Sequence, residues 1–144
     1  MQVARLLRTK GTDVVVVAPD QPVAEVLAVL ARHRIGAVVV SEDGTAIAGV
    51  LSERDVVAAL ADRGAGVLDE PAARLMTDEV VTCEPDTTIE WLMATMTERR
   101  IRHVPVVVDE QLAGLVSIGD VVKHHVAELE HETQAMREYI THPY

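Results

Sequence analysis

The chain has 144 residues and a formal net charge of −10, and aromatic side chains make up only 2% of it. This length suits one ordinary domain or two small halves that share a core. The acidic charge opposes the wrapping of nucleic acid, and the scarcity of aromatic residues argues against base stacking, so we expect no nucleic-acid partner. The single cysteine, Cys83, excludes an intrachain disulfide and a cysteine zinc cluster, and its apolar setting predicts a buried, inert thiol.

No part of the sequence predicts a signal peptide or a membrane-spanning segment. The first residues, MQVARLLRTKGT, lack the long apolar stretch of a signal peptide. No run reaches the roughly 18 apolar residues that a membrane span needs. We therefore expect a cytoplasmic protein with no membrane partner.

The chain contains an internal repeat. The segment VVVVAPDQPVAEVLAVLARHRIGAVVV, from Val14, lies over VVTCEPDTTIEWLMATMTERRIRHVPV, from Val80. Further on, GVLSERDVV from Gly49 lies over GLVSIGDVV from Gly114. A register shared over about fifty residues predicts two copies of one structural unit.

The first copy shows the order of elements in that unit. An apolar, β-branched run at residues 14–17 predicts a buried strand. Helical spacing of apolar residues then begins at Val23, and IGAVVV predicts a second strand. The turn SEDGT contains an Asp-Gly hairpin signal, AIAGVL predicts a third strand, and a helix begins at DVV.

The second copy repeats this order after a connector, ADRGAGVLDEPAARLMT, that has the composition of a linker. Its expected strands are residues 80–82, RHVPVVV and LAGLV, with a helix from Ile89. A short lead-in precedes each copy, since VARLLRTKGT resembles AARLMTDE. We predict an α/β (α+β) fold of two strand-helix-strand-strand-helix units packed through their sheets, with boundaries at 1–66, 67–125 and a helical tail at 126–144.

The tail predicts one extended helix. Its apolar residues are spaced by mixed threes, fours and sevens, and Thr133 interrupts the stripe that they form. Such a stripe is typical of a seam against another surface, either of this molecule or of a partner. The apolar positions are Val122, Val126, Leu129, Met136 and Ile140.

The repeated Ser-x-x-Asp phrase has two interpretations. As structure alone, Ser52 caps a helix and Asp55 completes a capping box, although Glu or Gln is usual at that place. As chemistry, a helix N-terminus favours phosphate, a serine hydroxyl adds a hydrogen bond, and a carboxylate one turn on can accept from two ribose hydroxyls. Both interpretations apply equally to Ser117 and Asp120.

The whole pattern resembles a tandem pair of cystathionine-β-synthase (CBS) domains, often called a Bateman module, over about residues 1–125. Both copies end in Gly-hydrophobic-hydrophobic-Ser-x-x-Asp before a helix. The resemblance implies a non-catalytic regulatory module whose clefts bind adenosine-containing ligands, namely AMP, ADP, ATP, and sometimes NAD or S-adenosylmethionine. AMP is the ligand that we expect first. It also implies a homodimer and an effector protein that reads it.

The resemblance assigns roles by position. Asp55 and Asp120 become acceptors for ribose hydroxyls, with Ser52 and Ser117 near phosphate. The apolar residues Val14 and Val80 would face the adenine. The starts of the second strands would line the clefts: Gly36, Ala37 and Val38 in the first copy; Arg102, His103, Val104 and Pro105 in the second.

The two copies differ in their cations. The second copy has Arg102 and His103 where the first has Gly36 and Ala37, and the first motif carries Arg54 where the second has Gly119. Because each cleft of such a module takes groups from both units, Arg54, Arg102 and His103 could surround one phosphate. We expect unequal sites, and weaker binding as the pH rises through the titration of His103 if that imidazole contacts phosphate.

The sequence also bears on three other functions. Catalysis needs a nucleophile with a base, a metal or paired carboxylates, and the sequence offers no convincing set. His124, Glu128 and His131 share a helix face and could bind a metal, although a solvated polar face explains them as well, and we expect no metal site. A pure dimerisation module with vestigial clefts is the main alternative.

Overall fold

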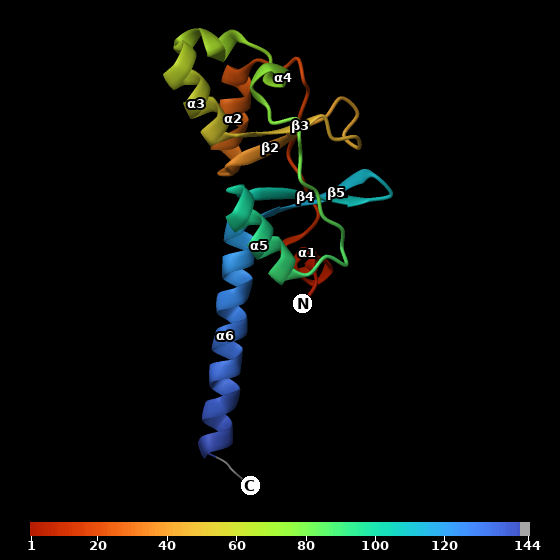
Figure 1. Ribbon diagram of the computed structural model, residues 1–144, viewed down its shortest axis with the longest axis vertical. Helices are drawn as coiled ribbons and strands as arrows, with labels where there is room; N and C mark the ends of the chain where they lie inside the picture. Colours follow the sequence, from red (N-terminus) through yellow and green to blue (C-terminus); the bar gives the residue numbers. More distant parts are fainter. Residues whose placement is uncertain (142–144) are drawn as a thin grey trace.

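The computed structural model describes residues 1–141, so the last three residues of the predicted tail lie outside the described part. Two α/β units are stacked with their sheets facing one another, and the helices lie on the outer sides (Figure 1). The α/β (α+β) class predicted from the sequence is confirmed. No helix of residues 1–141 has both the length and the apolar character needed to cross a bilayer.

The first unit is built around a three-stranded sheet with the order β1-β2-β3. Strand β1 runs parallel to β2, and β2 pairs with β3 in antiparallel register, with Ala37 opposite Ser52. All four residues of β2 are buried, which agrees with its uninterrupted apolar sequence. The elements of this unit are β1 (Val16–Val17), α2 (Val23–His33), β2 (Ala37–Val40), β3 (Gly49–Ser52) and α3 (Glu53–Arg63).

The second unit repeats the helices and the hairpin of the first. Strands β4 and β5 pair in antiparallel register, with His103 opposite Ser117. A short 3-10 helix and a short α-helix occupy the connector that the sequence treats as a linker. These connector elements are η1 (Ala65–Asp69) and α4 (Ala72–Leu75), and the elements of the second unit are α5 (Ile89–Arg99), β4 (His103–Val108), β5 (Gln111–Ser117) and α6 (Ile118–Thr141).

The first strand of each unit is shorter than predicted, and in the second unit it is missing. Residues 14–17 give only Val16–Val17, and residues 80–82 form no strand, leaving one bridge between Cys83 and Val106. In the first unit the Val39 N–H donates to the Val15 carbonyl at 3.2 Å. Pro105 holds the equivalent place and has no N–H, so the second ladder cannot extend toward Val81.

The two lead-in segments are exchanged between the units. Helix α1 (Val3–Lys10) packs its buried Val3, Leu6 and Leu7 into the core of the second unit. Its first turn is held there by hydrogen bonds from Val3 N–H to the Thr87 carbonyl and from Ala4 N–H to the Pro85 carbonyl, both 2.8 Å. Each unit therefore borrows a lead-in, since α4 packs in the core of the first unit. The predicted boundaries at 66 and 125 stay predictions.

Cys83 lies inside the second core and is 4% exposed. Burial, and to a smaller extent the neighbouring Glu84 carboxylate, raise the pKa of its thiol to about 11. A thiol that stays protonated near neutral pH is a poor nucleophile, as expected from its apolar setting.

Candidate functional site

A cleft of about 400 Å³ lies between the two units, within the size range of small-molecule sites. The first unit contributes the end of β3 and the first turn of α3. The second unit contributes the start of β4 and the segment before it. The lining residues are Gly36, Val50, Ser52, Glu53, Arg54, Asp55, Thr77, Glu79, Val80, Val81, Arg100, Ile101, Arg102 and His103.

The Ser-x-x-Asp phrase forms a capping box at the N-terminus of α3. The Asp55 N–H donates to Ser52 Oγ at 3.2 Å, and the Ser52 N–H donates to Asp55 Oδ2 at 2.9 Å. The structural interpretation of the phrase is therefore confirmed. It does not exclude the chemical interpretation, because both hydrogen bonds that Ser52 donates to the Asp55 carboxylate go to Oδ2, and both residues line the cleft. Among residues 1–141, Asp55 takes part in no ion pair.

The second unit brings cations to the opposite wall of the cleft. Helix α5 ends at Arg99. The next residue, Arg100, has a left-handed φ of 55°, and the chain then turns into β4. This turn places Arg100 and Arg102 in the lining beside His103. With Arg54, three guanidinium groups gather in one cleft of a protein whose net charge is −10. The same lining contains the carboxylates of Glu53, Asp55 and Glu79, so binding of an anionic group would depend on where the arginines are placed and not on an excess of positive charge.

Seven of the predicted ligand-binding residues line this cleft: Gly36, Ser52, Arg54, Asp55, Val80, Arg102 and His103. The others lie elsewhere. Ala37, Val38, Val104 and Pro105 are buried in the sheets behind the cleft, and Val14 is half-buried ahead of β1. Sequence reasoning missed Val50, Glu53, Thr77, Glu79, Val81, Arg100 and Ile101. Arg100 could have been predicted, because it lies two residues before Arg102, where the strand start implied by the resemblance begins.

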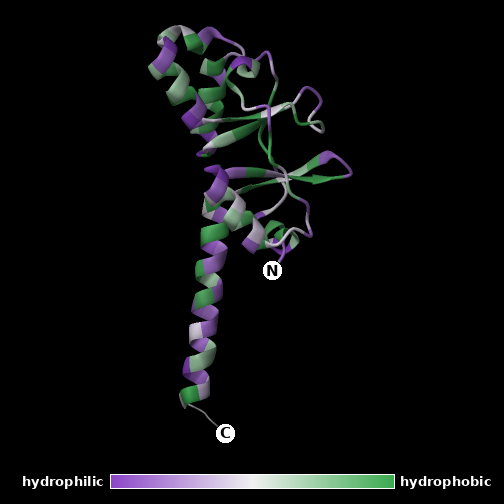
Figure 2. Ribbon diagram, in the orientation of Figure 1, coloured by the Kyte–Doolittle hydropathy of each residue, from purple (hydrophilic) through white to green (hydrophobic). Residues whose placement is uncertain are grey.

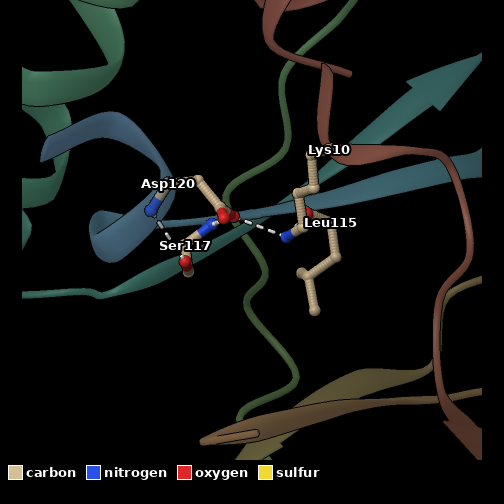
Figure 3. Close-up of polar contacts among 4 residues, drawn as sticks. All are labelled: Lys10, Leu115, Ser117 and Asp120. Carbon is tan, nitrogen blue, oxygen red and sulfur yellow. Dashed lines mark hydrogen bonds and ion pairs between the residues drawn. The ribbon is translucent and has the colours of Figure 1, made fainter. Parts of the chain in front are cut away.

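The second motif makes the same capping box but is engaged by a lysine. The Ser117 N–H donates to Asp120 Oδ2 at 2.8 Å, and the same oxygen accepts from Lys10 Nζ at 2.5 Å. Lys10 also donates to the Leu115 carbonyl, as Figure 3 shows. Burial raises the pKa of Asp120, but the hydrogen bonds from Lys10 and Ser117 outweigh it and lower the pKa below its usual value. The two acidic residues of the repeat thus have different surroundings.

His103 lies near both motifs. Burial and the Lys10 ammonium lower its pKa below the usual 6.5, the Asp120 and Glu53 carboxylates oppose that shift, and Arg102 adds to it. A side chain built at Gly36 would have its Cβ 3.4 Å from both Glu53 Oε1 and His103 Cε1, so the absence of a side chain leaves room for these two groups.

We expect the free energy of unfolding to fall as the pH drops below about 6.5. The lowered pKa of His103 means that the unfolded chain binds more protons in that window, so acid favours unfolding. Urea unfolding at a series of pH values measures this dependence. The His103→Gln variant should show a shallower dependence, and identical pH profiles for the two proteins would contradict the prediction.

Within residues 1–141, no three His, Cys, Asp or Glu side chains are grouped so that they could hold a metal ion. Among the three tail residues considered as metal ligands, His124, Glu128 and His131, the structure brings together only His124 Nε2 and Glu128 Oε2, which lie 3.9 Å apart. His124 Nε2 is itself buried and has no hydrogen-bond partner among residues 1–141, so the solvated-face interpretation fits Glu128 and His131 but not His124.

Comparison with known protein families decides the class of the chain. The sequence model of the CBS domain matches residues 3–62 and residues 72–127, which together make up most of the chain. The chain belongs to the CBS domain family. The two matches correspond to the two copies of the repeat, so the resemblance inferred from the sequence is confirmed.

Solved CBS structures share the fold. A CBS-domain containing protein from Agrobacterium tumefaciens is 46% identical, with a TM-score of 0.84 and coverage of 87% of this chain and 99% of that one. A CBS domain protein from Pyrobaculum aerophilum, solved in complex with AMP, is 29% identical, with a TM-score of 0.73 and coverage of 83% and 89%.

Known CBS proteins match at similar levels. A mitochondrial CBS domain-containing protein of Arabidopsis thaliana is 36% identical over 125 residues, which are 84% of this chain and 61% of that protein. The chain thus spans less than two thirds of the length of that relative. A CBS domain-containing protein of Bacillus subtilis strain 168 is 29% identical, with coverage of 83% and 84%.

Proposed function

We propose that this CBS pair is a non-catalytic regulatory module that binds an adenosine-containing ligand, AMP in the first instance, in the cleft at Asp55. The observation that carries the proposal is the composition of the cleft. It combines Asp55 and Ser52 at a helix N-terminus with three arginines from both units, in a lining that also contains Glu53 and Glu79. A ribose needs an acceptor for its hydroxyls, and a phosphate needs donors and positive charge.

The roles of the residues follow from this chemistry. Asp55 would accept from the ribose hydroxyls, while Ser52 and the N-terminus of α3 would donate to phosphate. The arginines would surround the phosphate. The adenine would lie against the apolar part of the lining, which consists of Val50, Val80, Val81 and Ile101. Ser117 and Asp120 stay candidates for a second, weaker site, because Lys10 competes for the Asp120 carboxylate.

The AMP complex of the Pyrobaculum aerophilum relative supports the choice of ligand. AMP offers the three recognition groups that the cleft is equipped to meet. ADP, ATP, NAD and S-adenosylmethionine share the adenosine part and differ in what is attached to it. The arginines favour an anionic attachment, so S-adenosylmethionine is the least expected of these ligands.

Regulation would proceed by population shift. A ligand that contacts both units stabilises one relative arrangement of them, in proportion to its difference in affinity for the two arrangements. A homodimer and an effector protein that reads its geometry belong to this proposal. A cytoplasmic location also belongs to this proposal. The Arabidopsis relative is named as mitochondrial, so mitochondria are the alternative compartment.

Calorimetric titration tests the function. The purified, nucleotide-stripped protein would be titrated with AMP, ADP, ATP, NADH and S-adenosylmethionine. We expect AMP to bind with one strong site per chain, because the Lys10 ion pair neutralises Asp120. Two sites of equal affinity would contradict the prediction that the two Ser-x-x-Asp motifs bind unequally. No binding by any ligand would reject the sensor and leave the ligand-independent dimerisation module.

A further inference from the structure

The last helix leaves the body of the protein. Helix α6 begins at Ile118 and continues to Thr141, well past the second unit (Figure 1). Its only buried residue is Val121, near its start, and every residue from 125 to 141 is exposed. Most helical stability in proteins comes from the packing of an apolar face, so an unpacked helix lacks its main source of stability.

The exposed helix carries an apolar stripe with coiled-coil spacing. Six residues follow one another at alternating steps of four and three: Val122, Val126, Leu129, Thr133, Met136 and Ile140. The five apolar members are between 47% and 74% exposed, and Figure 2 shows apolar and polar residues alternating along the helix. The body packs on another side of the helix, at Val121 and His124. The stripe is therefore free to meet a second surface.

We propose that the stripe pairs with the same stripe of a second copy of this chain, in a parallel, in-register, two-stranded coiled coil. In heptad notation, β-branched residues occupy the a positions, namely Val126, Thr133 and Ile140. The d positions are Val122, Leu129 and Met136, with the leucine at the centre. Among parallel coiled coils, β-branched residues at a with leucine at d favour two strands. This pattern allows the helix to pair with an identical helix, a property that binding to a different protein would not require.

The polar member of the stripe suits burial in this pair. Thr133 Oγ1 donates to the Leu129 carbonyl of its own helix at 2.9 Å. Its hydroxyl is already bonded, so burial at the interface leaves no unsatisfied donor.

The charges beside the stripe select the parallel orientation. In register, Glu132 at a g position faces Arg137 at the following e position of the second copy. An antiparallel pair centred near residue 131 would instead place Glu130 against Glu130 and Glu132 against Glu132 of the second copy. It would also bring Lys123 near Arg137 of the second copy. All of these are like-charge contacts, which are destabilising.

Disulfide trapping tests the pair, with full-length Thr133→Cys and a control, Ala135→Cys, on the side away from the stripe. The native Cys83 is 4% exposed and does not compete. In a glutathione redox buffer, Thr133→Cys should form a linked dimer at an effective concentration at least about tenfold higher than Ala135→Cys. Equal linking of the two variants, or none, overturns the proposal.

Two charge variants test whether the stripe itself holds the pair. In the Thr133→Cys background, Leu129→Glu with Met136→Glu should abolish the linked dimer. The matched pair Ala127→Glu with Ala135→Glu introduces the same charge outside the stripe and should leave it intact. Wild-type protein should sediment at twice the 15.6 kDa chain mass. A monomer, or a linked dimer that survives both charges in the stripe, overturns the proposal.

Discussion

Replacing Asp55 by asparagine should weaken AMP binding by roughly tenfold to hundredfold, with little change in stability. An asparagine side chain keeps the oxygen that accepts from the Ser52 N–H, so the capping box of α3 is retained. It loses the negative charge and one of the two acceptor oxygens that would meet the ribose hydroxyls. Hydrogen bonds to charged groups contribute about 1.5–3 kcal/mol each, which sets the expected range.

The repeat supplies the matched control for this substitution. Asp120→Asn makes the same change in the same local motif, but its carboxylate is already paired with Lys10. We therefore expect AMP affinity within about threefold of wild type for Asp120→Asn. Calorimetric titration of both variants measures the difference. If Asp120→Asn lost more AMP affinity than Asp55→Asn, the AMP site would lie at the second motif, Ser117 to Asp120.

Replacing Gly49 by alanine should destabilise the fold by at least about 3 kcal/mol. A Cβ built at Gly49 would lie 2.6 Å from Met76 Sδ and 2.7 Å from the Thr77 carbonyl oxygen. The Met76 side chain can move, but the Thr77 backbone cannot easily do so. Its carbonyl accepts from the Val50 N–H at 3.0 Å, and its N–H donates to the Val50 carbonyl at 2.9 Å. Alanine would have to break this bridge or displace β3.

Two other glycines provide controls for the Gly49 prediction. Gly114 is the equivalent residue of the second copy, but its Cβ would meet only the flexible Leu7 side chain, at 3.0 Å. Gly66 has no atom within 4 Å of that position. In urea unfolding, Gly114→Ala should cost less than about 1.5 kcal/mol and Gly66→Ala should be neutral or slightly stabilising. Equal costs at Gly49 and Gly114 would refute the backbone clash.

The sequence predicted the fold well where local patterns determine it. The repeat, the helices from Val23 and Ile89, the strand pairs and the extended last helix are read from periodicity and turn residues. The missing strand before Cys83 was predictable in principle, because Pro105 stands where Val39 donates in the first copy. The packing of α1 in the second unit and of α4 in the first was not predictable in this way. The two lead-in sequences are similar, so their residues do not indicate which core each helix joins.

Seven of the fourteen residues that line the candidate site were predicted from the sequence. The motif around Asp55 and the strand start at Arg102 line the cleft, because both lie at element ends that face the other unit. The distinction between Asp55 and Asp120 depends on Lys10, which lies 110 residues before its partner in the chain. No local pattern encodes a contact of that separation. Glu53 and Thr77 were missed for a related reason, since only the stacking of the units brings them into the lining.

The exchanged lead-ins also bear on how the chain is completed during synthesis. Helix α1 is made before the elements that it packs against, because its partners in the core include Val104, Val116 and Val121, about a hundred residues further along the chain. Until the ribosome has released β4 and β5, the apolar side of α1 has no place to pack. Helix α1 is therefore among the last of these elements to become ordered, and neither copy of the repeat with its own lead-in carries a complete core.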